Sequence, residues 1–399
     1  ITSSHIRVTT TITLFFGIIY LIKPNLWTTL FELPPILMFA MFLELLCMPA
    51  LEFWAAKERF DFKYKKYVAV SIAMTILSLG GGVIAVINTD YKVEARVYTD
   101  VISKVIFAGI LFFILMLNGK KIYSKKYWKY ALAFNIPLIP HYLSNYVLSQ
   151  SDRVMIGKMV GNDKAALYSV AYTISTMMIL IVSAVNSSLT PVIYKKLDEY
   201  ENTKINCNIL RRQIINVTTP ICMLIAVLCL VTMLFAPEVI LIFAGKRYIE
   251  AVYVVPPVSL SVYFIFLYSM FSNVEYYYQK TKLISIATFI SAVLNLVLNA
   301  IFIKLFGFCA AGYTTLVSYI CLAIMHFIFY SVIIKNNKMK YVFDIRTILI
   351  ISVFLVFIMI LITMTYKDML IRYGFVFLIM LLCFWKKNRI IEIIIKMKG

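Results

Sequence analysis

The 399-residue chain is 62% hydrophobic and only 15% charged, and it carries a formal net charge of +20. Because soluble domains contain about 25% charged residues, this composition excludes an ordinary soluble domain and is typical of a membrane protein. The positive charge does not indicate nucleic-acid binding, since the basic residues lie between apolar runs and form no soluble basic face.

Twelve apolar segments follow one another along the chain, and a helical crossing of the bilayer needs about 20 such residues. Backbone groups in lipid must bond within the protein, so these segments are predicted to be helices; the alternating pattern of a barrel strand is absent. The predicted fold is an all-α integral membrane protein. The segments lie near residues 8–22, 33–50, 67–88, 98–117, 131–150, 166–187, 213–235, 253–271, 283–303, 309–334, 347–365 and 370–385.

Most basic residues lie in alternate connections between these segments, which the positive-inside rule places in the cytoplasm. Both visible termini are then cytoplasmic, and the basic tail is either an amphipathic surface helix or a loose segment. The chain starts with neither an initiator Met nor a signal peptide, so we expect a trimmed or fragmentary N-terminus. The basic connections are 57–66, 120–129, 195–212, 280–282 and 335–346, together with Arg7 and the tail after Trp385.

The segment near residues 131–150 contains Pro137 and Pro140, each of which removes an intrahelical hydrogen bond. This helix is therefore predicted to be bent or broken, as helices at transporter binding sites often are. Polar groups that face lipid are costly, so a polar stripe on one face should meet a protein interior or a watery cavity. The stripe consists of His141, Asn145, Ser149 and Asp152.

A few charged side chains lie within or beside the apolar segments, where Arg and Lys cost about 2.5–3.5 kcal/mol to insert and usually have a partner or a function. Asp152 and Arg153, with Lys158 following, either line an anion-binding cavity or cap and anchor the helix at the interface. Lys104 either serves cargo or snorkels to the interface. Glu44 is either a proton-linked carboxylate or a hydrogen-bonded one.

The sequence lacks the motifs of covalent chemistry. It has no G-x-x-x-x-G-K-[ST] phosphate cradle, no H-E-x-x-H, no clustered His and Cys spacing and no G-x-S-x-G. The seven cysteines show no C-x-x-C spacing and are interpreted as free thiols. We therefore expect no cofactor, no metal site and no enzymatic activity.

Two stretches carry a family resemblance. SNYVLSQSDRVMIGKMVGNDKAALYSVAY, residues 144–172, looks like the seventh helix, outer turn and eighth helix of bacterial Wzx-type flippases. FWAAKERFDFKYKKY, residues 53–67, is also similar to this family. The chain thus resembles, over nearly its whole length, the polysaccharide-biosynthesis transporters of the MOP superfamily, which includes multidrug MATE exporters and the lipid II flippase.

The resemblance implies a MATE-like fold of fourteen helices, with two six-helix lobes around a central cavity and a terminal helix pair. Aligned on Asp152 and Arg153, the chain lacks the first two family helices. The expected domains are the remainder of the N-lobe at residues 1–130, the C-lobe at 131–334, and the terminal pair with a basic cytoplasmic tail at 335–399.

The function that the resemblance implies is movement of an undecaprenyl-diphosphate-linked oligosaccharide across the bacterial cytoplasmic (inner) membrane by alternating access, for O-antigen (lipopolysaccharide), capsule or another surface polysaccharide. Expected partners are this lipid-linked oligosaccharide, membrane lipids, and the polymerase and chain-length regulator of the pathway. A cavity with excess positive charge suits a diphosphate. The expected cavity residues are Arg153, Lys158, Lys104, His141, Asn145, Ser149 and Asp152, with Lys57 and Arg59 at the cytoplasmic mouth and Glu44 as a candidate for ion coupling.

Two other functions stay open from the residues alone. A MATE-like multidrug or cation antiporter should favour acidic groups for cationic cargo, whereas the intramembrane charges here lean basic. A membrane polysaccharide polymerase or glycosyltransferase should carry a substantial outer loop with acid, base or diphosphate-binding residues. The longest expected outer connection, residues 237–253, is short and half apolar.

Overall fold

The computed structural model describes residues 2–31, 34–117, 125–203, 207–337, 339–374 and 377. All regular structure in these ranges is helical, either α-helix or short 3-10 helix, with no strand. The chain divides into two compact units, Ile1–Phe134 and Asn135–Gly399. The basic connection in the sequence had suggested a boundary between residues 130 and 131.

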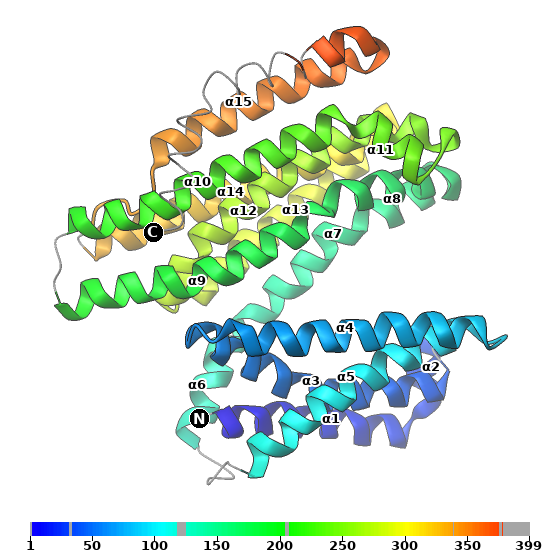
Figure 1. Cartoon of the computed structure of the whole chain (residues 1–399), viewed down its shortest axis with the longest axis vertical. Helices are drawn as coiled ribbons and strands as arrows, with labels where there is room; N and C mark the ends of the chain where they lie inside the picture. The colour runs from blue at the N-terminus through cyan, green and yellow to red at the C-terminus, as the bar shows by residue number, and fades with distance from the viewer. Residues whose placement is uncertain are drawn as a thin grey trace. The chain divides into compact units, whose positions relative to one another are not determined.

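The first unit is a small helical bundle whose main contacts join α3 to α5 and α4 to α5 (Figure 1). Its core is small, with Cys47, Leu51 and Ala108 buried where α3 and α5 meet. Most other apolar side chains of this unit face outward, as expected where lipid replaces water as the solvent. The helices are α1 (Thr2–Ile22), α2 (Pro24–Phe31), α3 (Pro35–Phe60), α4 (Tyr64–Ile87), α5 (Lys92–Leu117) and α6 (Lys125–Asn135).

The second unit is built around α12, whose side chains are buried on all of its faces. It packs most extensively against α14, and also against α8, α9 and α10 (Figure 1). The helices are η1 (Ile136–Leu138), α7 (Ile139–Met159), α8 (Asn162–Thr176), α9 (Met178–Thr203), α10 (Cys207–Leu234), α11 (Ala236–Phe243), η2 (Lys246–Val254), α12 (Val255–Tyr277), α13 (Thr281–Phe306), α14 (Ala310–Asn336), α15 (Ile345–Met364) and η3 (Thr365–Lys367).

Nine helical stretches among the described residues are long and apolar enough to cross a membrane, and each coincides with a predicted segment. The other three predicted segments are not among these nine stretches. The segment near 8–22 forms a shorter apolar helix, Ile6–Ile22. The segment near 131–150 is less apolar because of its polar stripe, and most of the segment near 370–385, like the basic tail, lies outside the described residues.

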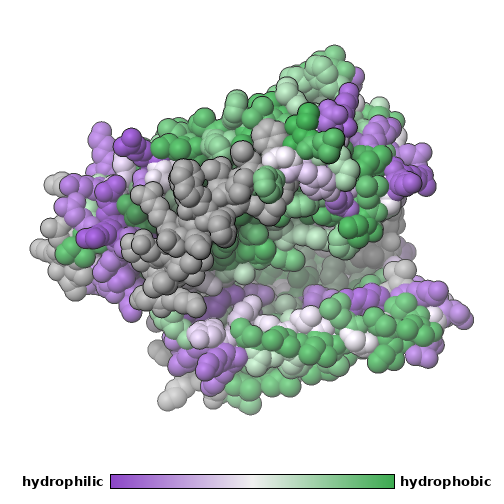
Figure 2. Space-filling model, turned by 45° about the horizontal axis from the view of Figure 1, so that its top comes forward, coloured by the Kyte–Doolittle hydropathy of each residue, from purple (hydrophilic) through white to green (hydrophobic). Residues whose placement is uncertain are grey.

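The all-α membrane fold is confirmed. Figure 2 shows hydrophobic side chains over the middle of the helices and hydrophilic ones near their ends.

The predicted break at the prolines of residues 131–150 is present. Helix α6 ends at Asn135, the 3-10 segment η1 contains Pro137, and α7 begins at Ile139. The carbonyl of Pro137 accepts a hydrogen bond from the Ser285 hydroxyl on α13, which ties the 3-10 segment to α13 within the same unit.

The same turn closes α3 and α12, one in each unit. Phe62 and Gln279 both adopt φ 56°, in the left-handed region. The amides of Lys63 and Lys280 each donate to the carbonyl of the glutamate five residues earlier, at 2.8 Å in both turns. In each unit the next helix, α5 or α14, packs against both members of this hairpin. The two units therefore share a three-helix motif.

Candidate functional site

Asp152 on α7 is the centre of a buried hydrogen-bond network in the second unit. Its side chain has no exposed surface. It accepts hydrogen bonds from Tyr168 on α8, Asn299 on α13 and Thr315 on α14, each at 2.6 Å. A carboxyl group can remain inside a membrane protein only if such partners replace water, so this residue ties four helices together.

The network continues through a second amide, Asn295, one turn from Asn299 on α13. Its carbonyl accepts from the Ser151 hydroxyl at 3.1 Å and from the Asn299 amide at 3.1 Å, and its amide donates to Thr315 at 3.3 Å. The Thr314 hydroxyl donates to the carbonyl of Asn299. Asn295 and Asn299 are spaced i,i+4 in an apolar segment, a pattern that can bridge helices by hydrogen bonds, but the threonines on α14 carry no recognisable signal.

Complete burial changes the expected role of Asp152. We predicted that it lines a cavity, yet it lies inside the unit and its hydrogen bonds go to neutral donors. The reason is geometric, because consecutive residues differ by about 100° around a helix. Asp152 points into the unit, where it contacts α8, α13 and α14, whereas Arg153 lies on the ring of Tyr172 on α8.

Arg153 is half-buried and lies against an aromatic ring. Its guanidinium lies 4.6 Å from the centre of the Tyr172 ring and donates to the Gln150 side chain. Its Nε–H is buried and has no hydrogen-bond partner among the described residues. No ion pair of the described chain involves it. A cation held on an aromatic face with donors to spare is suited to an incoming anion.

The earlier part of the polar stripe forms a second, smaller cluster. The Thr288 hydroxyl on α13 donates its hydrogen to the Ile284 carbonyl at 2.9 Å, so His141 Nδ1–H donates to Thr288, at 2.6 Å. His141 Nε2 then accepts from the Asn145 amide at 3.1 Å. This pattern assigns the neutral tautomer with both ring nitrogens satisfied. Ser149 donates to the Tyr146 carbonyl of its own helix, at 3.0 Å.

Lys158 is not brought together with Arg153. It is exposed in the last turn of α7, and a separation of five residues places the two cations about 140° apart around the helix. At the end of α3, Lys57 is exposed, and Arg59 lies 5.3 Å from the centre of the Tyr67 ring. These three residues are surface groups of their own units.

Lys104 and Glu44 meet in the first unit, together with a carboxylate that sequence analysis missed. Lys104 Nζ lies 2.7 Å from Glu44 on α3 and 2.8 Å from Asp100 on its own helix, α5. The Ser78 hydroxyl on α4 donates to Asp100 at 2.6 Å, and Arg96 donates to the Ser78 carbonyl at 3.1 Å. Two cations and two carboxylates thus balance one another, which reduces the cost of placing charge among apolar helices.

A second missed pair lies wholly inside the second unit. Glu275 on α12 and His326 on α14 are both fully buried, with His326 Nδ1 2.8 Å from the carboxylate. The Tyr268 ring stacks on His326 with ring centres 5.5 Å apart. Nothing in the local sequence pattern links His326 to a glutamate 51 residues away.

These features define the class of protein: a multi-pass α-helical membrane protein in which the charged groups inside the helical units are paired or hydrogen-bonded. The chain belongs to the polysaccharide biosynthesis protein family, whose model matches residues 9–253. This match confirms the family that the sequence resemblance indicated.

Two curated relatives come from Haemophilus influenzae. One, described as an uncharacterized membrane protein, is 25% identical over 235 residues, covering 58% of this chain and 56% of the relative. The other, Lsg locus putative protein 1, is 24% identical over 242 residues, covering 58% of each. The aligned part of this chain thus spans less than two thirds of either relative.

Solved structures establish the fold independently. A mutant form of the MATE transporter VcmN of Vibrio cholerae is similar with a TM-score of 0.65 and 14% identity, over 84% of this chain and 79% of that one. The lipid II flippase MurJ, in an inward closed conformation, gives a TM-score of 0.59 and 16% identity, over 98% of this chain and 84% of MurJ. The chain therefore has the fold of the MATE and MurJ transporters.

Proposed function

We propose that this protein is a flippase that moves an undecaprenyl-diphosphate-linked oligosaccharide from the cytoplasmic to the outer leaflet of the bacterial inner membrane, by alternating access. The observation that carries the proposal is the polysaccharide biosynthesis family match over residues 9–253, on a chain with the MATE and MurJ fold. The product serves O-antigen, capsule or another surface polysaccharide. The pathway's polymerase and chain-length regulator are the proposed partners.

Arg153 is the residue we propose to meet the diphosphate. Its charge has no carboxylate partner in the described chain, and the face of Tyr172 holds the guanidinium in place. By contrast, the carboxylates that hold Lys104 already compensate its charge. His141 and Asp152 keep Arg153's helix in position through buried bonds to α13. Among the proposed cationic residues, Arg153 is therefore the best candidate for binding the diphosphate. Lys158 lies on another face of the same helix.

The basic connections support the proposed orientation. The turn after α3, the turn after α12 and the connector from α14 to α15 all carry Lys or Arg, which the positive-inside rule places in the cytoplasm. Lys57 and Arg59 then lie at the cytoplasmic end of α3, where they are placed to meet a cytoplasmic cargo first.

The test is Arg153→Ala in a complete version of the gene, expressed in the strain that lacks it. We expect surface glycan to be lost while the amount of protein in the membrane is retained, because the cation–π contact stabilises by only about 0.5–2 kcal/mol. Arg247→Ala is the matched control, since Arg247 is an exposed arginine of the same unit with 81% of its side chain accessible. Normal glycan display by Arg153→Ala would argue against its role.

A second measurement separates the flippase from the other two candidate functions. In the deletion strain, a flippase defect leaves lipid-linked repeat units in the cytoplasmic leaflet, where they are accessible in inverted vesicles. A polymerase defect leaves single repeat units displayed outside, and loss of a cation antiporter changes drug resistance with glycan intact. Either of the last two outcomes would overturn the proposed function.

A further inference from the structure

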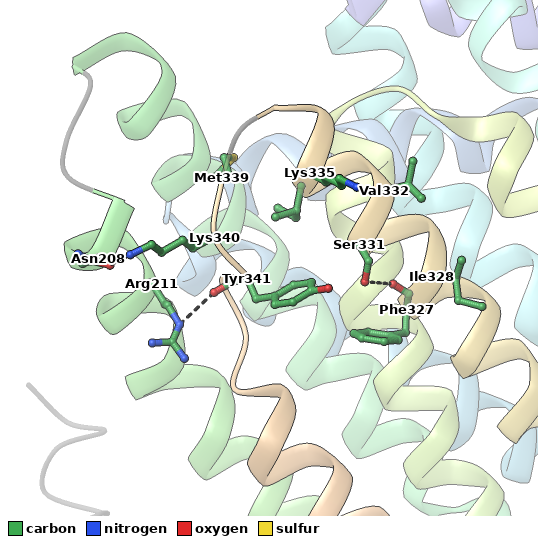
Figure 3. A pocket seen from close by; sticks show the side chains of 11 residues that line it. Asn208, Arg211, Phe327, Ile328, Ser331, Val332, Lys335, Met339, Lys340 and Tyr341 are labelled. Atoms are coloured by element: carbon green, nitrogen blue, oxygen red, sulfur yellow. Dashed lines mark hydrogen bonds between the residues drawn. The ribbon is translucent and has the colours of Figure 1, made fainter.

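Two adjoining spaces lie in the second unit, one at an end of its helices and one along them. A basic pocket of about 960 Å³ opens between the first turn of α10, the last turns of α14 and the connector to α15 (Figure 3). An apolar groove of about 490 Å³ runs between α12, α14 and α15. Phe327 on α14 lines both, so the groove begins where the pocket ends.

The basic pocket is built by contacts that fix the connector. The amide of Lys340 donates to the Cys207 thiol at 3.3 Å, and the Val342 amide donates to the Tyr330 hydroxyl at 2.8 Å. The Tyr341 ring lies 6.2 Å from Phe327 and 5.9 Å from Tyr330, between centres. Figure 3 shows this ring directed toward α14. Residues 340–342 of the connector thus form a fixed wall with an aromatic surface.

Three cations of this pocket have no counter-charge in the described part of the protein. Arg211 donates its Nε–H to the Tyr341 carbonyl at 3.1 Å, which leaves its terminal amino groups for another acceptor. The Lys340 ammonium group donates to the neutral Asn208 side chain at 3.1 Å, and Lys335 lies in the last turn of α14 (Figure 3). None of the ion pairs among the described residues involves Arg211, Lys335 or Lys340.

The groove has the opposite chemistry. Its lining is aliphatic and aromatic apart from Ser352, whose hydroxyl is bonded to the Ile348 carbonyl of its own helix, at 2.8 Å. Ile324 and Leu349 present exposed side chains on its two sides. Such a surface gains nothing from a polar ligand and favours a hydrocarbon chain.

We propose that these two spaces form one binding site for an anionic glycerophospholipid, with the phosphate in the basic pocket and an acyl chain in the groove. The charge of the pocket selects the headgroup, because cations close to the membrane surface attract anionic lipids. The planar Arg211 side chain offers paired donors that match phosphate oxygens. A free phosphate would occupy only the pocket. Because Phe327 lines both spaces, a single lipid molecule can place its headgroup in the pocket and an acyl chain in the groove. The site is separate from Arg153 and does not depend on the cargo.

The proposal is tested on the purified full-length chain in detergent by native mass spectrometry. Phosphatidylglycerol and phosphatidylethanolamine with identical acyl chains are added in equal amounts. We expect phosphatidylglycerol to be preferred by about tenfold or more. The triple variant Arg211→Gln, Lys335→Gln, Lys340→Gln should lose this preference, and Ile324→Trp, which fills the groove from an exposed position, should weaken binding of both lipids.

A matched triple variant controls for net charge: Lys246→Gln, Arg247→Gln and Lys367→Gln remove three exposed cations at the opposite ends of these helices. It should keep the wild-type preference. If the pocket triple variant misfolds, the single exposed variant Lys335→Gln provides the same comparison with a smaller expected loss.

Several outcomes would overturn the proposal. These are equal binding of both lipids by the wild type, an unchanged preference in the pocket variants, or binding that Ile324→Trp leaves intact. Glycerol 3-phosphate that binds as tightly as the lipid would show a site for phosphate alone. Undecaprenyl phosphate that displaces phosphatidylglycerol at equal concentration would show that a polyprenyl lipid is the occupant.

Discussion

Asp152 and its three donors illustrate at the residue scale why a polar side chain can be essential without being a cargo contact. Each donor comes from a different helix, and each hydrogen bond satisfies a group that has no access to water. If the carboxyl is removed, the hydroxyl groups of Tyr168 and Thr315 and the amide of Asn299 lose their acceptor together. We therefore expect removal of the Asp152 carboxyl to lower the stability of the protein first and to reduce transport only as a consequence.

We predict that Asp152→Ala lowers the free energy of unfolding by about 3 kcal/mol or more, because it leaves several buried donors unpaired. Asp152→Asn should cost less, since its amide oxygen still accepts. Thermal unfolding of the detergent-purified protein measures both. Ser149→Ala, on the same helix, is the control: the Ser149 hydroxyl donates to the Tyr146 carbonyl of its own helix, so a change within about 0.5 kcal/mol is expected. A melting curve for Asp152→Ala that matches the wild type would contradict this assignment.

Lys104 shows the same distinction in the first unit. A lysine in an apolar segment can serve cargo, snorkel or pair, and the sequence left the first two open. The carboxylate that could have been noticed is Asp100, four residues earlier and therefore one helical turn away. Glu44 is 60 residues distant, and only packing of α3 against α5 brings it to Lys104. Local spacing can reveal the first partner but not the second.

At the element scale, apolar length predicted most of the crossing helices because lipid requires every backbone group to bond within its own segment. Proline predicted the break at Pro137 for the same reason, since the missing donor is a local property. The sequence left open whether the polar stripe on α7 faces the protein interior or a watery cavity, so it could not provide the direction of the stripe. That direction depends on Thr288, Asn295 and Asn299, which lie on another helix well over 100 residues later.

The turn between α7 and α8 gives a prediction at this scale. Gly161 adopts φ 128° and ψ 158°, a conformation that other residues avoid. Gly161→Ala should therefore lower the free energy of unfolding by about 1–3 kcal/mol, although nothing lies within 4 Å of the added methyl group. Gly109→Ala is the control, because Gly109 is inside α5 with equally open space and alanine favours a helix. Equal melting temperatures for the two variants would show that backbone conformation does not limit this turn.

At the scale of the whole molecule, the net charge of +20 is distributed unevenly. In the described spans, Lys104 is balanced by Glu44 and Asp100, and Glu275 is paired with His326. The excess of basic residues therefore lies mainly at helix ends and in connections. The ion pairs within the helices join neighbouring helices, whereas Arg153 is the group that we propose to meet an anion. We expect the charge at the helix ends to set the topology and the lipid contacts.

This separation predicts which ends of α12 face which side of the membrane. In a chain whose seven native cysteines are replaced by alanine, Lys246→Cys precedes α12 and Lys280→Cys follows it, and both positions are exposed. Because the basic turn after α12 is expected in the cytoplasm, a membrane-impermeant maleimide should label Lys246→Cys in intact spheroplasts and Lys280→Cys only after permeabilisation. Retained glycan display by the cysteine-free parent is the control. The reverse labelling pattern would invert the proposed direction of transport, and labelling of both positions from outside would mean that α12 does not separate them across the membrane.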